Sequence, residues 1–278
     1  MFTINCNGKL ISTEIPLVMG IINATPDSFY IGHLDEGHEG ILKLAGKMIA
    51  DGADILDIGG QSTRPGSERI TADEELKRVI PLIKLIRQQY KDIILSIDTY
   101  HSVVAEHAVK EGVSMINDIS GGEMDKKMLQ AAASLNVPYI CMHMKGTPAT
   151  MQQDIFYDNV VKEVLDFFSR KVDECRQAGI NDIIVDPGFG FGKNPPHNFQ
   201  LLHELAVFKM LDRPIMVGLS RKSTVYKTLH TTAGEALNGT TVLNTLALNN
   251  GADILRVHDV KEAKEAVTLF SAYKKAVS

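Results

Sequence analysis

The chain has 278 residues, of which 44% are hydrophobic and 23% charged, with a formal net charge of −5 at pH 7. This size suits one large α/β domain, and the mild acidity argues against a broad electrostatic grip on nucleic acid. No basic-then-apolar leader opens the chain, and no apolar run approaches the roughly 20 residues of a membrane helix. We therefore expect a cytoplasmic protein of one domain, residues 1–278, with no nucleic-acid or membrane partner.

Short apolar runs recur along the chain and predict strands, because a strand buried on both faces is hydrophobic throughout. The eight runs lie at residues 16–22, 54–58, 93–97, 115–117, 138–142, 182–186, 214–218 and 253–257. Four of them follow a glycine, the residue that takes the left-handed conformation at the end of a helix. These glycines are Gly52, Gly112, Gly179 and Gly251.

The stretches between the strands show helical spacing of their apolar residues. Residues 71–90 predict a helix that Thr71 caps, with Pro81 expected to kink it. Residues 157–177 predict another, and Asp259 with Glu262 can cap the last helix.

Strands that alternate with helices imply right-handed crossovers and a parallel sheet, and eight such units imply a closed (β/α)8 TIM barrel. An open doubly wound sheet is the alternative. It usually carries a glycine-rich phosphate loop after its first strand, whereas residues 23–27 contain no glycine.

Polar residues follow nearly every predicted strand. They are Asn23, Asp57, Asp98, Asn117, His143, Asp186, residues 220–222, Arg256 and His258. Any one of them could simply cap a helix or form a turn. In a barrel, however, all eight strand ends meet at one mouth, which is where barrel enzymes bind their ligands.

The mouth holds two kinds of group. Asp98, Asn117 and Asp186 suit a ligand with adjacent N–H donors, because a buried carboxylate needs a partner. An anion such as phosphate suits a second set, namely Asn23, Arg64, Arg256 and His258. A metal site built from histidines is disfavoured, because no H-x-x-H or H-E-x-x-H spacing occurs.

The strand-end segments resemble the dihydropteroate synthase family over nearly the whole chain. The matching segments are residues 19–29, 57–66, 96–99, 116–122, 142–148, 186–193, 218–223 and 256–260. The resemblance implies a transferase of folate biosynthesis that joins 6-hydroxymethyl-7,8-dihydropterin pyrophosphate to p-aminobenzoate, releasing pyrophosphate. It also implies Mg²⁺ as cofactor and a homodimer.

The resemblance further implies a role for each matching residue. Pterin would be held by Asp98, Asn117, Asp186, Lys222 and Arg256, and pyrophosphate by Asn23, Arg64, Arg256 and His258, with Asn23 on the metal. The p-aminobenzoate pocket would consist of Phe29, Thr63, Arg64, Pro65, Phe191 and Ser223. The residues expected to carry the reaction are Asn23, Arg64, Lys222, Arg256 and His258.

The chain departs from the family pattern at two positions. Ile31 stands where the first loop usually has an aspartate, and His33 or Asp35 is a candidate replacement. Gln61 stands where a glutamate is usual, which removes a negative charge beside Arg64.

Two other functions remain open from the sequence. A methyltetrahydrofolate:corrinoid methyltransferase shares the barrel, but it needs no anion site and should lack the segments at 62–66 and 220–223. A non-catalytic pterin-binding protein is favoured only by the altered first loop. The apolar face of the last helix fits either a dimer contact or packing on the barrel; it comprises Ala263, Ala266, Val267 and Phe270.

Overall fold

The computed structural model describes residues 1–24, 38–62, 66–153 and 155–276. Phe29, Ile31, His33 and Asp35 of the first loop lie outside the described residues, as do Thr63, Arg64 and Pro65 of the second. No helix in the described ranges is long and apolar enough to cross a membrane.

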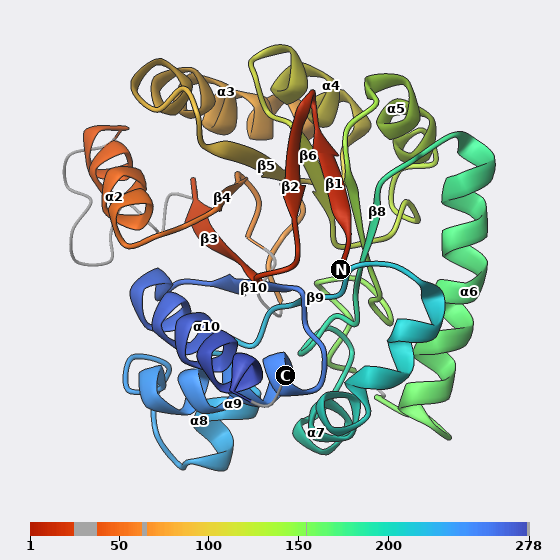
Figure 1. The fold of residues 1–278 in the computed structure, drawn as a ribbon. Helices are drawn as coiled ribbons and strands as arrows, with labels where there is room; N and C mark the ends of the chain where they lie inside the picture. Colours follow the sequence, from red (N-terminus) through yellow and green to blue (C-terminus); the bar gives the residue numbers. More distant parts are fainter. Residues whose placement is uncertain (25–37, 63–65, 154, 277–278) are drawn as a thin grey trace.

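Eight parallel strands form the centre of the molecule, and Figure 1 shows the helices arranged as a ring around them. The strands are β3 (Leu17–Asn23), β4 (Ile55–Gly59), β5 (Ile94–Asp98), β6 (Met115–Asp118), β7 (Tyr139–Met142), β8 (Ile183–Asp186), β9 (Met216–Val217) and β10 (Ile254–Val257). All eight predicted runs are strands, although the seventh shrinks to two residues.

The sheet closes on itself. Its strand order is β8-β7-β6-β5-β4-β3-β10-β9, and a parallel bridge between Val185 and Ile215 joins the two ends. The backbone N–H of Val185 donates to the carbonyl of Pro214 at 3.0 Å across this seam. The (β/α)8 barrel is therefore confirmed, and the open doubly wound alternative is wrong.

The surrounding helices follow the strands in chain order. They are α2 (His38–Ala50), α3 (Ala72–Gln89), α4 (Ser102–Lys110), α5 (Met128–Leu135), α6 (Val160–Ala178), α7 (Pro195–His203), the 3-10 helix η1 (Leu205–Leu211), α8 (Ser223–Thr228), α9 (Leu237–Asn249) and α10 (Val260–Lys275). The four glycines expected to end helices all have φ between +97° and +104°. Left-handed φ is cheap for glycine alone, which explains why the same residue recurs at these junctions.

Two capping expectations had different outcomes. Thr71 caps α3 as predicted, because its hydroxyl accepts from the backbone N–H of Glu74 at 3.2 Å, and the helix runs unbroken through Pro81. Asp259 makes no side-chain capping bond to α10. Its carboxylate instead pairs with both Nε and Nη2 of Arg221, at 2.8 and 2.9 Å.

A hairpin of β1 (Thr3–Cys6) and β2 (Lys9–Ser12) lies across the amino-terminal end of the barrel. Ile4 and Cys6 of the hairpin pack on an apolar layer to which every barrel strand contributes. The layer comprises Leu17, Met19, Ile55, Ile94, Met115, Ile140, Ile184, Met216 and Ile254. We call this layer with Ile4 and Cys6 the barrel floor, and it seals one end of the barrel.

Candidate active site

The polar residues of the mouth lie on the same strand faces as the barrel floor. Asp57 comes two residues after Ile55, and Asp186 comes two residues after Ile184. Asn117 and Arg256 follow floor residues of β6 and β10 by the same step. Because strand side chains alternate with a period of two, these polar groups also face the barrel interior, one layer nearer the carboxyl ends.

Arg256 bridges two carboxylates at the centre of this layer. Its Nε donates to Asp57 Oδ2 at 2.7 Å, and its Nη2 donates to Asp98 Oδ2 at 2.6 Å. Burial alone would lower the pKa of Arg256, but Asp57 and Asp98 outweigh it and raise the pKa above its ordinary value. For Asp98, burial raises the pKa to about 7 although Arg256 lowers it. The arginine therefore stays charged, whereas Asp98 titrates near neutrality.

Asp57 also fixes the orientation of Asn117. The Nδ2 of Asn117 donates to Asp57 Oδ2 at 2.9 Å, so the amide oxygen faces away from this bond. Within the described part of the chain, Asn117 Oδ1 and Asp57 Oδ1 are both buried and have no hydrogen-bond partner. Buried acceptors without partners are costly, and a ligand with N–H donors would satisfy them.

Asp186 lies in the same mouth, 5% exposed, and its Oδ1 accepts from the backbone N–H of Gly188 at 2.8 Å. Burial raises its pKa, and the nearby Lys222 lowers it. The Nζ of Lys222 donates to the carbonyl of Phe189 at 2.6 Å and lies 4.7 Å from the centroid of the Phe191 ring. Burial lowers the pKa of Lys222 to about 8, with Asp186 opposing the shift.

The adjoining strand ends carry the groups expected to bind an anion. Asn23 closes β3 beside Gly59, and His258 follows β10. The His258 Nδ1 lies 3.0 Å from Ser220 Oγ, and loss of hydration followed by the charge of Arg256 lowers its pKa to about 4. The imidazole is therefore neutral at neutral pH, with Nδ1 committed to the serine.

The described residues contain no group of three or more His, Cys, Asp or Glu that could hold a metal ion. On the described residues alone, a metal at this mouth would find few protein ligands and would take others from the substrate. Mg²⁺ fits that requirement, because it prefers few protein oxygens together with phosphate oxygens and water. The amide oxygen of Asn23 is a suitable donor of this kind.

Gln61 has a defined structural role at the start of the second loop. Its Nε2 donates to the carbonyls of Ser62 and Glu68, both at 2.8 Å, and its Oε1 accepts from the backbone N–H of Ile70 at 2.8 Å. A glutamate here could not donate to two carbonyls. The amide at this position therefore ties the beginning of the loop to its end.

The structure brings together every described residue that was expected in the pterin set, and it places Phe191 and Ser223 beside Lys222. Sequence reasoning missed Asp57 as a site residue, although it had noted the residue at a strand end. The two-residue step from Ile55 was the signal that could have identified it. Phe29, Thr63, Arg64 and Pro65 lie outside the described residues.

Comparisons with known proteins agree with this geometry. The family model described as "Pterin binding enzyme" matches residues 19–258. A dihydropteroate synthase of Escherichia coli is 42% identical over 267 residues, covering 95% of this chain and 94% of its own length.

Two solved structures are similar over nearly all of both chains. The Yersinia pestis dihydropteroate synthase in a sulfonamide drug complex has a TM-score of 0.94 and 38% identity, covering 99% of this chain and 100% of its own. The Xanthomonas albilineans dihydropteroate synthase with 4-aminobenzoic acid has a TM-score of 0.91 and 38% identity, covering 98% of each chain.

Proposed function

The chain belongs to the pterin-binding enzymes and, among them, to the dihydropteroate synthase family, and on that premise we propose how its barrel mouth performs the reaction. The reaction joins 6-hydroxymethyl-7,8-dihydropterin pyrophosphate to p-aminobenzoate and yields 7,8-dihydropteroate and pyrophosphate. The observation that carries the proposal is the layer of buried acceptors around Asp57, Asn117 and Asp186, set directly beside Lys222 and Arg256.

The pterin occupies the interior layer. Asp186, Asp98 and Asn117 accept hydrogen bonds from the pyrimidine N–H groups, and Lys222 donates to the pterin. The unpartnered Oδ1 of Asn117 supports this role, because a ligand donor would satisfy it. Arg256, held by Asp57, presents the plane of its guanidinium to the ring system.

The pyrophosphate lies outward of the pterin. Arg256 and His258 bind its oxygens, together with Arg64, which lies outside the described residues. Asn23 would hold Mg²⁺ jointly with the pyrophosphate oxygens and water, and when bound the ion would neutralise charge on the leaving group.

The chemistry is a displacement at the methylene carbon of the pterin. The bond from this carbon to the pyrophosphate oxygen breaks, the p-aminobenzoate nitrogen bonds to the carbon, and the amine proton passes to the departing pyrophosphate or to water. Among the described mouth residues, none is placed as a covalent nucleophile: Ser220 is bonded to His258 and Lys222 to a carbonyl. Positioning and stabilisation of the leaving group therefore supply the rate.

The second substrate lies against Phe191 and Ser223. Phe29, Thr63, Arg64 and Pro65 would complete the pocket from the two loops outside the described residues. A sulfonamide drug, a ligand of the similar Yersinia pestis enzyme, is expected to compete with p-aminobenzoate there.

Pyrophosphate release by the purified protein tests the function. We expect release only when the pterin pyrophosphate and p-aminobenzoate are both present with Mg²⁺. A non-catalytic pterin-binding protein would bind the pterin without releasing pyrophosphate, and a corrinoid methyltransferase would consume methyltetrahydrofolate instead. Either result would overturn the proposal.

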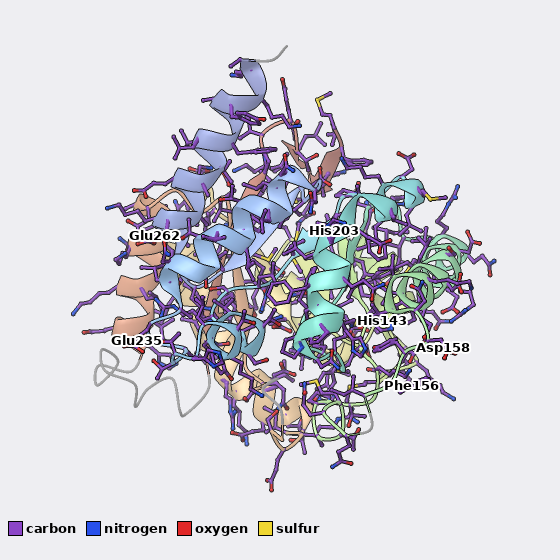
Figure 2. All side chains as sticks on the ribbon, turned by 90° about the horizontal axis from the view of Figure 1, so that it is seen from below. His143, Phe156, Asp158, His203, Glu235 and Glu262 are labelled. Carbon is purple, nitrogen blue, oxygen red and sulfur yellow. The ribbon has the colours of Figure 1, made fainter. Side chains whose placement is uncertain are left out.

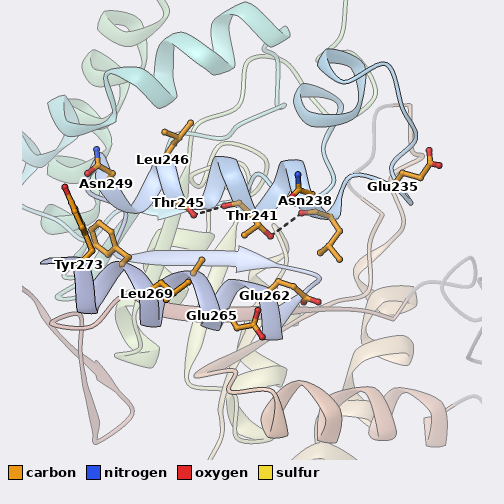
Figure 3. Close-up of a pocket in the computed structure, with 13 residues that line it drawn as sticks. Glu235, Asn238, Thr241, Thr245, Leu246, Asn249, Glu262, Glu265, Leu269 and Tyr273 are labelled. Carbon is orange, nitrogen blue, oxygen red and sulfur yellow. Dashed lines mark hydrogen bonds between the residues drawn. The ribbon is translucent and has the colours of Figure 1, made fainter. Parts of the chain in front are cut away.

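We also propose that the chain acts as one barrel domain in the cytoplasm and pairs as a homodimer through the outer face of α9 and α10. A groove of about 890 Å³ runs between these helices, on the outside of the barrel (Figure 3). Leu246, Leu269 and Tyr273 line it and are 45%, 72% and 63% exposed.

The apolar residues expected on the last helix divide between the two roles. Ala263 and Val267 are buried against the barrel, whereas Ala266 and Phe270 line the groove. Sedimentation of the wild type and of Leu269→Glu tests the dimer. We expect a dimer that the charged variant converts to monomer, and a monomeric wild type would exclude this interface.

A further inference from the structure

The loop from β8 to α7 approaches the end of β7 with no space between the backbones. Gly188, Gly190 and Gly192 have φ of +70°, +83° and +65°. A side chain on Gly188 would overlap the His143 carbonyl, and one on Gly192 would come within 2.5 Å of the Lys145 carbonyl. A loop with three glycines in five residues does not hold such a shape by backbone preference alone.

Lys193 ends this loop with its side chain turned inward, only 2% exposed. Its Nζ lies 3.0 Å from the carbonyl oxygens of Gly188 and Phe191, 3.3 Å from that of His143, and 2.8 Å from His143 Nδ1. Every partner is an acceptor, and none is a carboxylate. Burial lowers the pKa of Lys193 well below its ordinary value, with Asp186 opposing the shift. A buried amine is costly unless it is hydrogen-bonded, so its four contacts must do what an apolar side chain could not.

His143 is a neutral acceptor in this cluster. Burial, followed by the charges of Lys193 and Lys145, lowers its pKa to about 2. The ring packs edge-on against Phe167 at 4.9 Å between centroids, and Figure 2 shows His143 on the same side of the molecule as Phe156 and Asp158. The imidazole is thus fixed by packing and offers Nδ1 to the lysine.

The loop carbonyls are held one after another by side chains. Lys193 donates to the carbonyls of Gly188 and Phe191. Lys222 donates to the Phe189 carbonyl at 2.6 Å, and Gln152 Nε2 donates to the Gly190 carbonyl at 3.0 Å. Lys193 therefore supplies two of these four bonds, including the one to the carbonyl of Phe191 itself.

We propose that Lys193 is a positioning residue for the second substrate: its buried Nζ holds the loop so that the Phe191 ring forms a preformed wall of the p-aminobenzoate pocket. The inference rests on the proposed function of this mouth. It assigns to Lys193 no contact with either substrate.

The test is Lys193→Met, which keeps the length and apolar stem but removes every donor. Lys145→Met is the matched control, because this neighbouring lysine is 45% exposed. The readouts are the KM for each substrate and the calorimetric affinity for 6-hydroxymethyl-7,8-dihydropterin, all at one pH.

We expect Lys193→Met to raise the KM for p-aminobenzoate roughly tenfold or more, because three carbonyls and an imidazole lose their donor. Pterin affinity should change much less, because Asn117 and Arg256 are held by bonds to Asp57 that do not involve this loop. The control should match the wild type on both readouts. An unchanged KM for p-aminobenzoate, or equal losses for both ligands, would show that Lys193 serves only stability.

If Lys193→Met does not fold, Lys193→Gln is measured instead, since its amide retains two donors on a shorter stem. The same comparison applies, between the change in KM for p-aminobenzoate and the change in pterin affinity. The wild type separates the two hypotheses. If it binds pterin but releases no pyrophosphate, the proposed function fails, whatever the variants do. If it turns over normally and the variants show no selective effect on p-aminobenzoate, only the role of Lys193 fails.

Discussion

The two ends of the barrel interior are made by the same strands and have opposite chemistry. At the amino-terminal end, Ile55 and Ile184 belong to an apolar floor sealed by a hairpin. Two residues further along, Asp57 and Asp186 face a polar mouth. A period of two keeps both layers on the inner face, so stability and ligand recognition occupy neighbouring positions of one strand without sharing a residue.

The two layers also differ in what burial does to them. Removing apolar side chains from water stabilises the floor. In the mouth, burial opposes ionisation and raises the pKa of both Asp98 and Asp186. The mouth is therefore a region where binding groups are kept at a cost in stability that the rest of the barrel offsets.

The largest expected loss of stability comes from placing a carboxylate, as found in the mouth, in the barrel floor. Ile184→Asp places an unpaired charge in the apolar layer, at a cost of about 3–5 kcal/mol or more. We expect no cooperative thermal transition by circular dichroism. The control Ile184→Val should cost only about 1 kcal/mol. A melting temperature near that of the wild type for the Asp variant would contradict the sealed, apolar floor.

A change within the mouth should remove activity and leave the fold intact. Arg256→Lys keeps the positive charge, but one ammonium cannot reproduce the planar fork that reaches Asp57 and Asp98. We expect kcat/KM to fall roughly 100-fold or more. If the variant keeps most of its activity, the bidentate role of the guanidinium is wrong.

Two aspartates at opposite ends of β8 give a matched comparison. Asp186→Ala leaves pterin donors without an acceptor and should weaken pterin binding by about 1–3 kcal/mol in calorimetry. Asp182 accepts from the Asn5 backbone at the floor end, so Asp182→Ala should leave pterin affinity unchanged. Wild-type pterin affinity in a folded Asp186→Ala protein would refute the assignment of this site.

The smallest expected effect concerns a buried carboxyl group outside the mouth, and it tests whether burial raises its pKa as it does for Asp98. Glu75 of α3 is fully buried and accepts from Thr99 Oγ1 at 2.9 Å. Burial raises its pKa from 4.5 to about 8; Thr99 opposes the shift, Asp98 adds to it, and Arg78 also opposes it. The folded state thus binds this proton more tightly than the unfolded state, and wild-type stability declines as pH rises through this window.

Glu75→Gln has no proton to lose. Its unfolding free energy relative to wild type should therefore rise by about 1–2 kcal/mol between about pH 6 and pH 8. Urea unfolding at both pH values measures this difference. A difference that does not vary with pH would show that Glu75 is ionised throughout.

The strands, the glycines that end helices and the barrel itself were all predictable, because they follow from local patterns. The hairpin at residues 3–12 was also readable: Asn7 and Gly8 form the two-residue turn that takes positive φ at both positions, here 54° and 89°. It was missed because the barrel pattern begins only after it.

The partners of individual side chains were less predictable. Asp259 directly precedes a helix and looks like a cap, yet it pairs with Arg221, which a different strand-end loop brings alongside. Lys193 follows a glycine-rich stretch and would ordinarily be assigned to the surface, whereas it is 2% exposed. Such choices depend on which strand ends become neighbours when the barrel closes.

The sealed floor has a consequence for molecular traffic. Because the barrel is closed at its amino-terminal end, both substrates and both products must pass through the mouth at the other end. In the proposed arrangement, the pterin lies deeper than p-aminobenzoate, so a p-aminobenzoate molecule that arrives first stands in the path of the pterin. The closed floor therefore favours an order of binding in which the pterin substrate enters first. The group bound deepest is then the last to leave.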